Sequence, residues 1–196
     1  LRSVGKAENV AEVEDKNTYI NEEFAQYITD SYVVDFEGNK VETDAFEVML
    51  GLTAEIRLPR EERNYPVFIY SENGGPKKYV VPVRGKGLWG PIWGYVALEE
   101  DLNTISGAVF DHKGETPGLG AEINTGWFQE PFTGKTIFND AGEFVSIEVV
   151  KGGADPSSPH QVDGISGGTI TSKALEEMLI DCMTGYVAHF KELANN

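Results

Sequence analysis

A stretch rich in glycine and hydroxyl side chains, "DGISGGTITS" at residues 163–172, precedes a clear helical pattern. A helix start leaves backbone N–H groups unpaired and carries a partial positive charge. Gly167 and Gly168 allow this backbone to approach a ligand closely. Hydroxyl donors surround them: Ser166, Thr169, Thr171 and Ser172. The pattern predicts an anion or phosphate site, but a plain N-cap by Thr171 or Ser172 explains the hydroxyls equally well.

The helix that follows is the clearest element in the sequence. Its apolar residues recur at spacings of three and four, which predicts one amphipathic helix over about residues 173–192. The stripe consists of Leu175, Met178, Leu179, Cys182, Tyr186, Val187 and Phe190. His189 lies near the end of this helix, where an imidazolium complements the helix dipole.

Alternating apolar residues and glycine-rich turns predict strands in the middle of the chain. We expect two hairpins, formed by Val67–Tyr70 with Lys78–Val83 and by Ile92–Leu98 with Thr104–Asp111. Further strands are expected near Tyr32–Phe36 and from Phe144 to an end at Lys151-Gly152-Gly153, and a short helix is expected after Thr43 or Asp44. Residues 1–15 are charged and weakly patterned, so we expect them to form a mobile or loosely docked start. The expected fold class is α+β, with mostly antiparallel sheets.

Composition excludes several functions. The chain has 196 residues and a formal net charge of -16, which argues against binding nucleic acid or anionic lipid. Its single cysteine, Cys182, permits no internal disulfide and is expected to be buried. The three histidines lack ligand-like spacing, so no metal site is expected. "GKGLWG" at 85–90 spells a dinucleotide fingerprint, but Pro91 and a β-rich run follow it instead of a helix.

The motif Asp163-Gly164-Ile165-Ser166-Gly167-Gly168-Thr169 resembles the flavinylation motif of covalent FMN-binding domains. In that family, a flavin transferase moves FMN from FAD onto the last threonine through a phosphoester bond. The resemblance therefore implies covalent FMN on Thr169, with Asp163 recognised by the transferase. Gly168 replaces the commoner alanine and keeps the position small.

Two further stretches resemble the C subunits of Na⁺-translocating NADH:quinone reductases. They are "GKGLWGPIWGYVAL" at 85–98 and "TISGAVFDHKGETPGLGAEI" at 104–123. The resemblance runs from about residue 77 to 190 and favours this kind of subunit over the G subunit of Rnf-type complexes. It implies an FMN-binding domain over residues 76–196, preceded by an α/β portion over residues 1–75 that carries no recognisable motif.

The same resemblance implies the residues of a flavin site. Leu88, Trp89 and Leu119 are apolar tips beside glycines, suited to the flat face of an isoalloxazine ring. Glu115 and Thr116 would hydrogen-bond the ring edge or the ribityl chain, and Lys151 would balance phosphate or flavin charge. From the residues alone, core packing explains the apolar side chains and a turn explains "ETPG" at 115–118.

The implied function is an electron relay through FMN inside a membrane-bound reductase. Its partners would be neighbouring redox subunits, with a flavin transferase needed for maturation. The domain would lie on the periplasmic side of a bacterial inner membrane, anchored by an N-terminal helix absent from this chain. Two alternatives stay open: an Rnf-type G subunit or stand-alone flavinylated carrier, and an acidic binding module without a cofactor.

Overall fold

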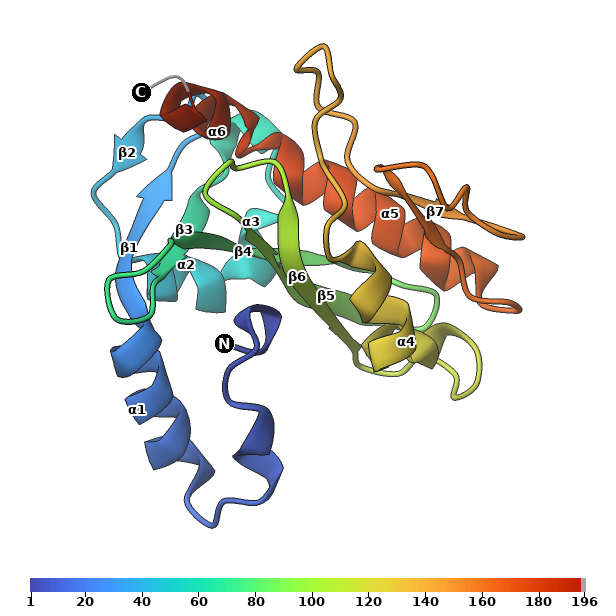
Figure 1. Cartoon of the computed structure of the whole chain (residues 1–196), viewed down its shortest axis with the longest axis horizontal. Coiled ribbons are helices and arrows are strands. Elements are labelled where there is room, and N and C mark those ends of the chain that lie inside the picture. The colour runs from blue at the N-terminus through green and yellow to red at the C-terminus, as the bar shows by residue number, and fades with distance from the viewer. Residues whose placement is uncertain (195–196) are drawn as a thin grey trace.

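The computed structural model describes residues 1–194, and its central feature is a six-stranded antiparallel sheet in the order β2-β1-β3-β4-β5-β6 (Figure 1). A small parallel pair, β7-β8, lies apart from it. The strands are β1 (Ile28–Val34), β2 (Lys40–Val41), β3 (Tyr65–Tyr70), β4 (Lys78–Lys86), β5 (Pro91–Leu98), β6 (Ile105–His112), β7 (Glu148–Val150) and β8 (Gln161–Asp163). The α+β class with mostly antiparallel strands is therefore confirmed.

Most of the helices are short, and the two longest are α1 and α5. The α-helices are α1 (Lys16–Tyr27), α2 (Ala45–Leu50), α3 (Leu52–Glu55), α4 (Gly126–Gln129), α5 (Thr169–Thr184) and α6 (Val187–Ala194). The 3₁₀ turns are η1 (Arg2–Val4), η2 (Glu8–Ala11), η3 (Arg60–Glu62), η4 (Gly120–Asn124) and η5 (Glu130–Phe132). The predicted cap of α2 is confirmed, since the Asp44 carboxylate accepts a hydrogen bond from the Glu47 N–H.

The sheet is covered on both faces. One face packs against α5 and α6 in a core that includes Val83, Leu175 and Phe190. The other face packs against α2 and the chain start in a second cluster that includes Val48 and Val4. All six residues of β3 are consequently buried, as expected of a strand with apolar layers on both sides.

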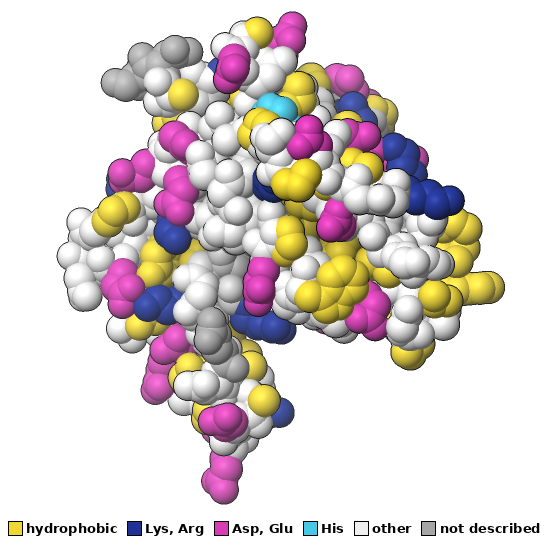
Figure 2. Space-filling view, turned by 45° about the vertical axis from the view of Figure 1, so that its right-hand side comes forward, with side chains coloured by type: hydrophobic (Ala, Val, Ile, Leu, Met, Phe, Trp, Pro, Cys, Tyr) yellow, Lys and Arg dark blue, Asp and Glu magenta, His cyan; other side chains and the backbone are white. Residues whose placement is uncertain are grey.

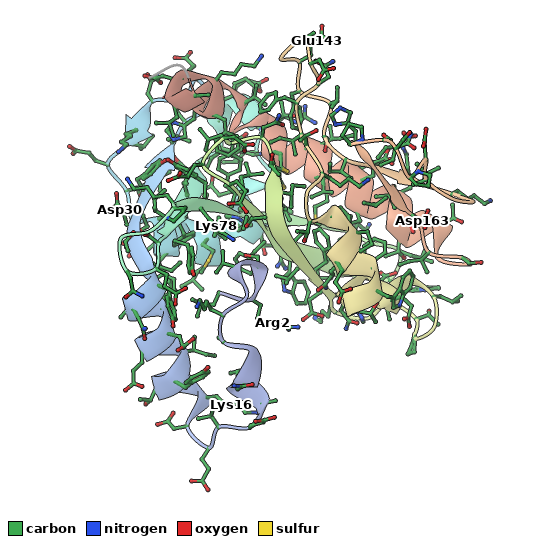
Figure 3. All side chains as sticks on the ribbon, viewed as in Figure 1. Arg2, Lys16, Asp30, Lys78, Glu143 and Asp163 are labelled. Carbon is green, nitrogen blue, oxygen red and sulfur yellow. The ribbon has the colours of Figure 1, made fainter. Side chains whose placement is uncertain are left out.

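The first seven residues are docked onto the sheet, so the prediction of a loose start is wrong for this part of residues 1–15, whereas residues 9–15 are exposed or half-buried. Ser3 and Val4 of η1 are buried. A Cβ at Gly107 of β6 would overlap the Ser3 carbonyl oxygen, so this glycine permits the contact. Helix α1, absent from the sequence predictions, buries none of its residues and extends away from the sheet, with Lys16 at its start (Figures 1 and 3).

Both central hairpins match the predictions, whereas the strand expected from Phe144 to an end at Lys151-Gly152-Gly153 forms only in its last part. Ser146 has φ 59, a left-handed conformation that interrupts an extended run. Only Glu148–Val150 forms β7, and it pairs in parallel with β8 instead of joining the main sheet. This small pair is attached to α5 because buried Glu176 accepts a hydrogen bond from the Val149 N–H at 2.9 Å.

The C-terminal helix is two helices, starting earlier than predicted and broken between α5 and α6. Gly185 lies at the break, where a Cβ would overlap the ring of Tyr65. His189 is buried in α6 and its Nε2 lies 2.7 Å from the Tyr32 hydroxyl. Burial lowers the pKa of His189 below its ordinary value. Because α6 begins at Val187, His189 also lies near the start of its helix, so the expected role as a cation that compensates the dipole at a helix end is wrong.

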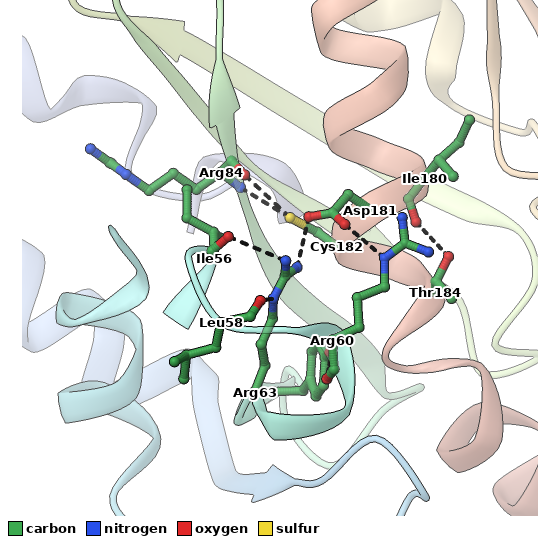
Figure 4. A network of polar contacts seen from close by, with 10 residues as sticks. Ile56, Leu58, Arg60, Arg63, Arg84, Ile180, Asp181, Cys182 and Thr184 are labelled. Atoms are coloured by element: carbon green, nitrogen blue, oxygen red, sulfur yellow. Dashed lines mark hydrogen bonds and ion pairs between the residues drawn. The ribbon is translucent and has the colours of Figure 1, made fainter. Parts of the chain in front are cut away.

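An ion-pair network ties the segment around η3 to α5 (Figure 4). Asp181 accepts hydrogen bonds from Arg60 Nε and Arg63 Nη1, both at 2.7 Å. Arg63 also donates to the carbonyls of Leu58 and Ile56. Beside this network, Cys182 is buried as predicted, and burial raises the pKa of its thiol to about 11.

The predicted division at residues 75 and 76 falls in the turn between β3 and β4, and strands from both sides pair in one sheet. The two-part division stays a prediction. Among the residues that the structure describes, no helix has both the length and the apolar character needed to cross a bilayer.

Candidate functional site

Three segments distant in sequence meet at one end of the sheet and form a groove of about 410 Å³. They are the β4–β5 turn, the loop after β6 and the start of α5, which lie together at the right of Figure 1. The lining consists of Leu88, Trp89, Glu115, Thr116, Leu119, Gly120, Gly167, Gly168, Thr169, Ile170 and Thr171. Nine of these eleven are residues that the sequence predicted for the site.

Thr169 is the first residue of α5 and is exposed, so its hydroxyl is accessible from solvent. Gly168 occupies the N-cap position, and no side chain caps the helix. The alternative that Thr171 or Ser172 is the cap is therefore wrong. Ser172 instead accepts a hydrogen bond from the Ile165 N–H at 3.0 Å. An uncapped helix start keeps its N–H groups available for an anion.

The glycines before Thr169 are required by their surroundings. Gly167 has φ 75, in the left-handed region that favours glycine, and a Cβ there would lie 2.7 Å from Leu119 Cδ2. At Gly168 a Cβ would lie 2.8 Å from Ile165 Cγ2. The small residues thus allow the start of α5 to lie directly against the loop that carries Leu119.

Glu115 lies at the base of the groove and is 4% exposed. Its Oε1 accepts a hydrogen bond from the Trp89 N–H at 2.9 Å, and its Oε2 accepts one from the Thr171 hydroxyl at 2.6 Å. The Glu115 N–H in turn donates to His112 Nδ1 at 3.1 Å. One carboxylate therefore joins all three segments that form the groove.

The walls of the groove are apolar and open to solvent. Leu88 is 43% exposed, Trp89 68%, Leu119 41% and Ile170 60%, so the alternative that Leu88, Trp89 and Leu119 are core residues is wrong. Figure 2 turns this end of the molecule toward the viewer and shows hydrophobic side chains gathered on it. Exposed apolar side chains concentrated around a concave site indicate a surface that binds an apolar ligand or partner.

Three predicted residues lie outside the lining. Lys151 is exposed and directly follows β7, and Ser166 is exposed in the turn before α5. Asp163 ends β8, where its Oδ1 accepts a hydrogen bond from the Ala154 N–H at 2.6 Å (Figure 3). The predictions omitted Gly120 and Ile170, although both directly follow predicted residues in sequence.

Two other hollows lie beside the N-terminal segment. One, of about 310 Å³, lies between Phe24 and Trp93, and the other, of about 510 Å³, lies between Arg2 and β6. Neither contains a residue of the 163–169 motif. Of these three hollows, all lined by described residues, the 410 Å³ groove combines apolar walls, an exposed hydroxyl and a helix start.

Residues 87–184 match the FMN-binding domain family. This stretch contains the β4–β5 turn, the loop after β6 and the start of α5, and hence the whole lining of the groove. Fold and site together define a flavin-binding protein.

The chain belongs to the family formed by the C subunits of Na⁺-translocating NADH-quinone reductases. It is 36% identical over 191 residues to the family member from Vibrio vulnificus, a match covering 90% of this chain and 74% of that protein. The match to the Pseudomonas aeruginosa member is 39% identical over 125 residues, covering 62% of this chain and 48% of that protein. The chain thus matches about half to three quarters of these relatives' lengths.

The fold agrees with that of solved family members. The crystal structure of the Parabacteroides distasonis member superposes with a TM-score of 0.80 at 42% identity, covering 96% of this chain and 87% of that one. That of Shewanella oneidensis NqrC gives 0.75 at 27% identity. The resemblance to this family is therefore confirmed.

The groove fits FMN by its chemistry. Its volume lies within the range typical of small-molecule sites. The apolar walls suit a flat aromatic ring, and the start of α5 suits a phosphate. Within the part of the chain that the structure describes, no lysine or arginine lines the groove, so backbone N–H groups, hydroxyls and the Trp89 indole N–H are the donors available there.

Proposed function

We propose that the chain carries FMN joined through its phosphate to the Thr169 hydroxyl. A flavin transferase would supply the group from FAD. The Thr169 oxygen forms a bond to the phosphorus of the FMN half, the bond from that phosphorus to the bridging oxygen breaks, AMP leaves, and the hydroxyl proton is released. The exposed position of Thr169 at an uncapped helix start is the observation that supports this proposal.

Each wall of the groove has a proposed role. Leu88 and Leu119 contact the ring, and the backbone at the start of α5 faces the phosphate. Thr116 hydrogen-bonds the polar edge of the ring or the ribityl chain. Lys151 lies outside the lining, and its proposed role is longer-range balancing of negative charge. Asp163 is proposed as part of the surface that the transferase recognises.

The bound FMN supplies the redox chemistry, and the protein residues hold it, exclude water from its faces and keep it attached. We propose that the chain relays electrons between redox subunits of a membrane-bound Na⁺-translocating NADH:quinone reductase. Family membership favours this function over an Rnf-type G subunit and over a module without cofactor. The proposed location is the periplasmic side of a bacterial inner membrane, with an N-terminal membrane helix outside this chain.

Co-expression with a flavin transferase tests the attachment. The wild-type chain should give a fluorescent band in a denaturing gel, and Thr169→Ala should give none because the nucleophilic oxygen is gone. Thr169→Ser keeps a hydroxyl at the same place and serves as the matched control, with attachment retained. Fluorescence of the Thr169→Ala band at wild-type intensity would contradict the proposal.

A further inference from the structure

We infer that Glu115 is a positioning residue of the flavin site, which fixes the Leu88–Trp89 tip at a set distance from Thr169. The inference rests on the proposed function of Thr169 for its consequence, but the contacts that carry it belong to the protein alone. Trp89 adjoins Leu88 in the β4–β5 turn, and Thr171 lies two residues after Thr169 in the first turn of α5. Glu115 contacts both.

The core packing of α5 on β4 sets the general position of these elements, and the two bonds of Glu115 add a direct connection between the β4–β5 turn and the start of α5. One carboxylate oxygen holds a backbone N–H of the β4–β5 turn, and the other holds a side-chain hydroxyl of α5. We call this arrangement of Trp89, Glu115 and Thr171 the Glu115 link. Because hydrogen bonds to a buried carboxylate are stronger and more directional than those in water, the link sets the width of the groove.

Two glycines make room for the link. A Cβ at Gly87 would lie 2.6 Å from Glu115 Oε1, and a Cβ at Gly120 would lie 2.6 Å from Glu115 Oε2. A Cβ at Gly120 would also overlap the Thr171 hydroxyl. The backbone on both sides of the carboxylate is thus kept free of side chains, so that Glu115 can reach both donors. "GKG" at 85–87 and "GLG" at 118–120 are explained in part by this requirement.

Helix α5 offers a matched control in Glu176. This second carboxylate is also buried, at 7% exposed, accepts a backbone hydrogen bond from Val149 and pairs with Lys173. It lies outside the groove lining. Replacing Glu176 therefore removes a second buried carboxylate, one that belongs to α5, and leaves the Glu115 link unchanged.

Amide hydrogen exchange of the flavin-free protein tests the link directly. In Glu115→Ala the Trp89 amide should exchange about 10- to 100-fold faster than in the wild type, because its charged acceptor is lost. Glu176→Ala should leave the Trp89 rate unchanged and speed exchange at Val149 instead. Unchanged protection of Trp89 in folded Glu115→Ala would overturn the inference.

The rate of flavin attachment tests the consequence. At a temperature where all variants are folded, Glu115→Ala should be flavinylated about tenfold or more slowly than Glu176→Ala. In Glu115→Gln the side-chain oxygen can still accept from the Trp89 N–H, and the side-chain NH2 group can donate to the Thr171 hydroxyl oxygen. The attachment rate of this variant should therefore lie within about threefold of the wild-type rate. If Glu115→Ala fails to fold, Thr171→Val removes one half of the link and should slow attachment in the same direction.

The two proposals fail in different ways. If the wild type takes up no flavin, the proposed function fails, while the exchange of Trp89 still reports whether the link exists. If the wild type is flavinylated and Glu115→Ala matches Glu176→Ala in attachment rate, the positioning role of Glu115 fails and the proposed function stands. Failure of Glu115→Gln to recover would also overturn the positioning role, because geometry would then not be what matters.

Discussion

Leu119 is the residue whose replacement should change the reduction potential of the flavin while leaving flavin attachment little changed. It is 41% exposed at the groove, with its side chain against Gly167, while the proposed bond to FMN forms at Thr169. Leu119→Glu places a negative charge beside the flavin and opposes its reduction. We expect the reduction potential to fall by about 30 mV or more, which is about 1.4 kcal/mol for a two-electron couple, with attachment little changed.

Redox titration and in-gel fluorescence measure these two effects separately. Val145→Glu is the matched control, because Val145 is also 41% exposed but lies outside the groove lining. It should change neither quantity. If Leu119→Glu lost flavin attachment to the same degree as it lowered the reduction potential, the prediction that Leu119 affects the potential and not attachment would be contradicted.

Single residues of the site differ in how well the sequence predicts them. Thr169 and its two glycines follow from a local motif, and the structure places all three on the groove. The link made by Glu115 does not follow from the sequence, since its two donors lie 26 and 56 positions away. A buried carboxylate bonded to distant partners leaves no periodic signal. Only the folded chain shows which residues it joins.

At the scale of elements, the joint between α5 and α6 depends on Gly185. A Cβ there would overlap the Tyr65 ring, which is held by the hydrogen bond from its hydroxyl to the Arg60 carbonyl. Gly185→Ala should destabilise the protein by about 1–3 kcal/mol through overpacking, seen as a lower midpoint in thermal denaturation. Gly114→Ala is the control, since nothing lies within 4 Å of its Cβ position. Equal midpoints for the two variants would contradict this account.

The elements that the sequence predicted well have local signals. The two hairpins alternate in apolar character around glycine turns, and both form where expected. The break at Gly185 was missed because the apolar stripe continues across it through Cys182, Tyr186 and Phe190. Helix α1 is harder to predict because its apolar stripe is short, consisting of Ile20, Phe24 and Tyr27, and none of these residues is fully buried.

At the scale of the whole molecule, Asp181 connects the segment before β3 with α5, across the predicted two-part division. Burial alone would raise the pKa of Asp181, but hydrogen bonds from Arg60 and Arg63 lower it below its ordinary value of 3.8. A lowered pKa means that the folded state favours the charged form. This contribution to stability is therefore present above about pH 4 and is lost as the pH falls through the folded-state pKa.

Asp181→Asn should therefore lose about 1–2 kcal/mol of unfolding free energy at pH 7, a modest value because the carboxylate is about one-third exposed. The difference from the wild type should shrink as the pH falls below 4, because the wild-type carboxylate is then protonated. Denaturant unfolding at several pH values measures this. The pair Lys78–Glu99, whose charged atoms lie 3.6 Å apart, provides the control variant Glu99→Gln, which should change stability by less than about 0.5 kcal/mol. A difference in unfolding free energy that stayed constant at all pH values would contradict the lowered pKa of Asp181.

The central claim is one covalent bond at one oxygen atom. Peptide mass mapping of the chain, purified after co-expression with a flavin transferase and then denatured, tests it most directly. We predict that the peptide containing Thr169 gains the mass of one FMN joined with loss of water, and that fragmentation places this mass on Thr169. An unmodified Thr169 peptide, or FMN on Ser166 or Thr171 instead, would contradict the account.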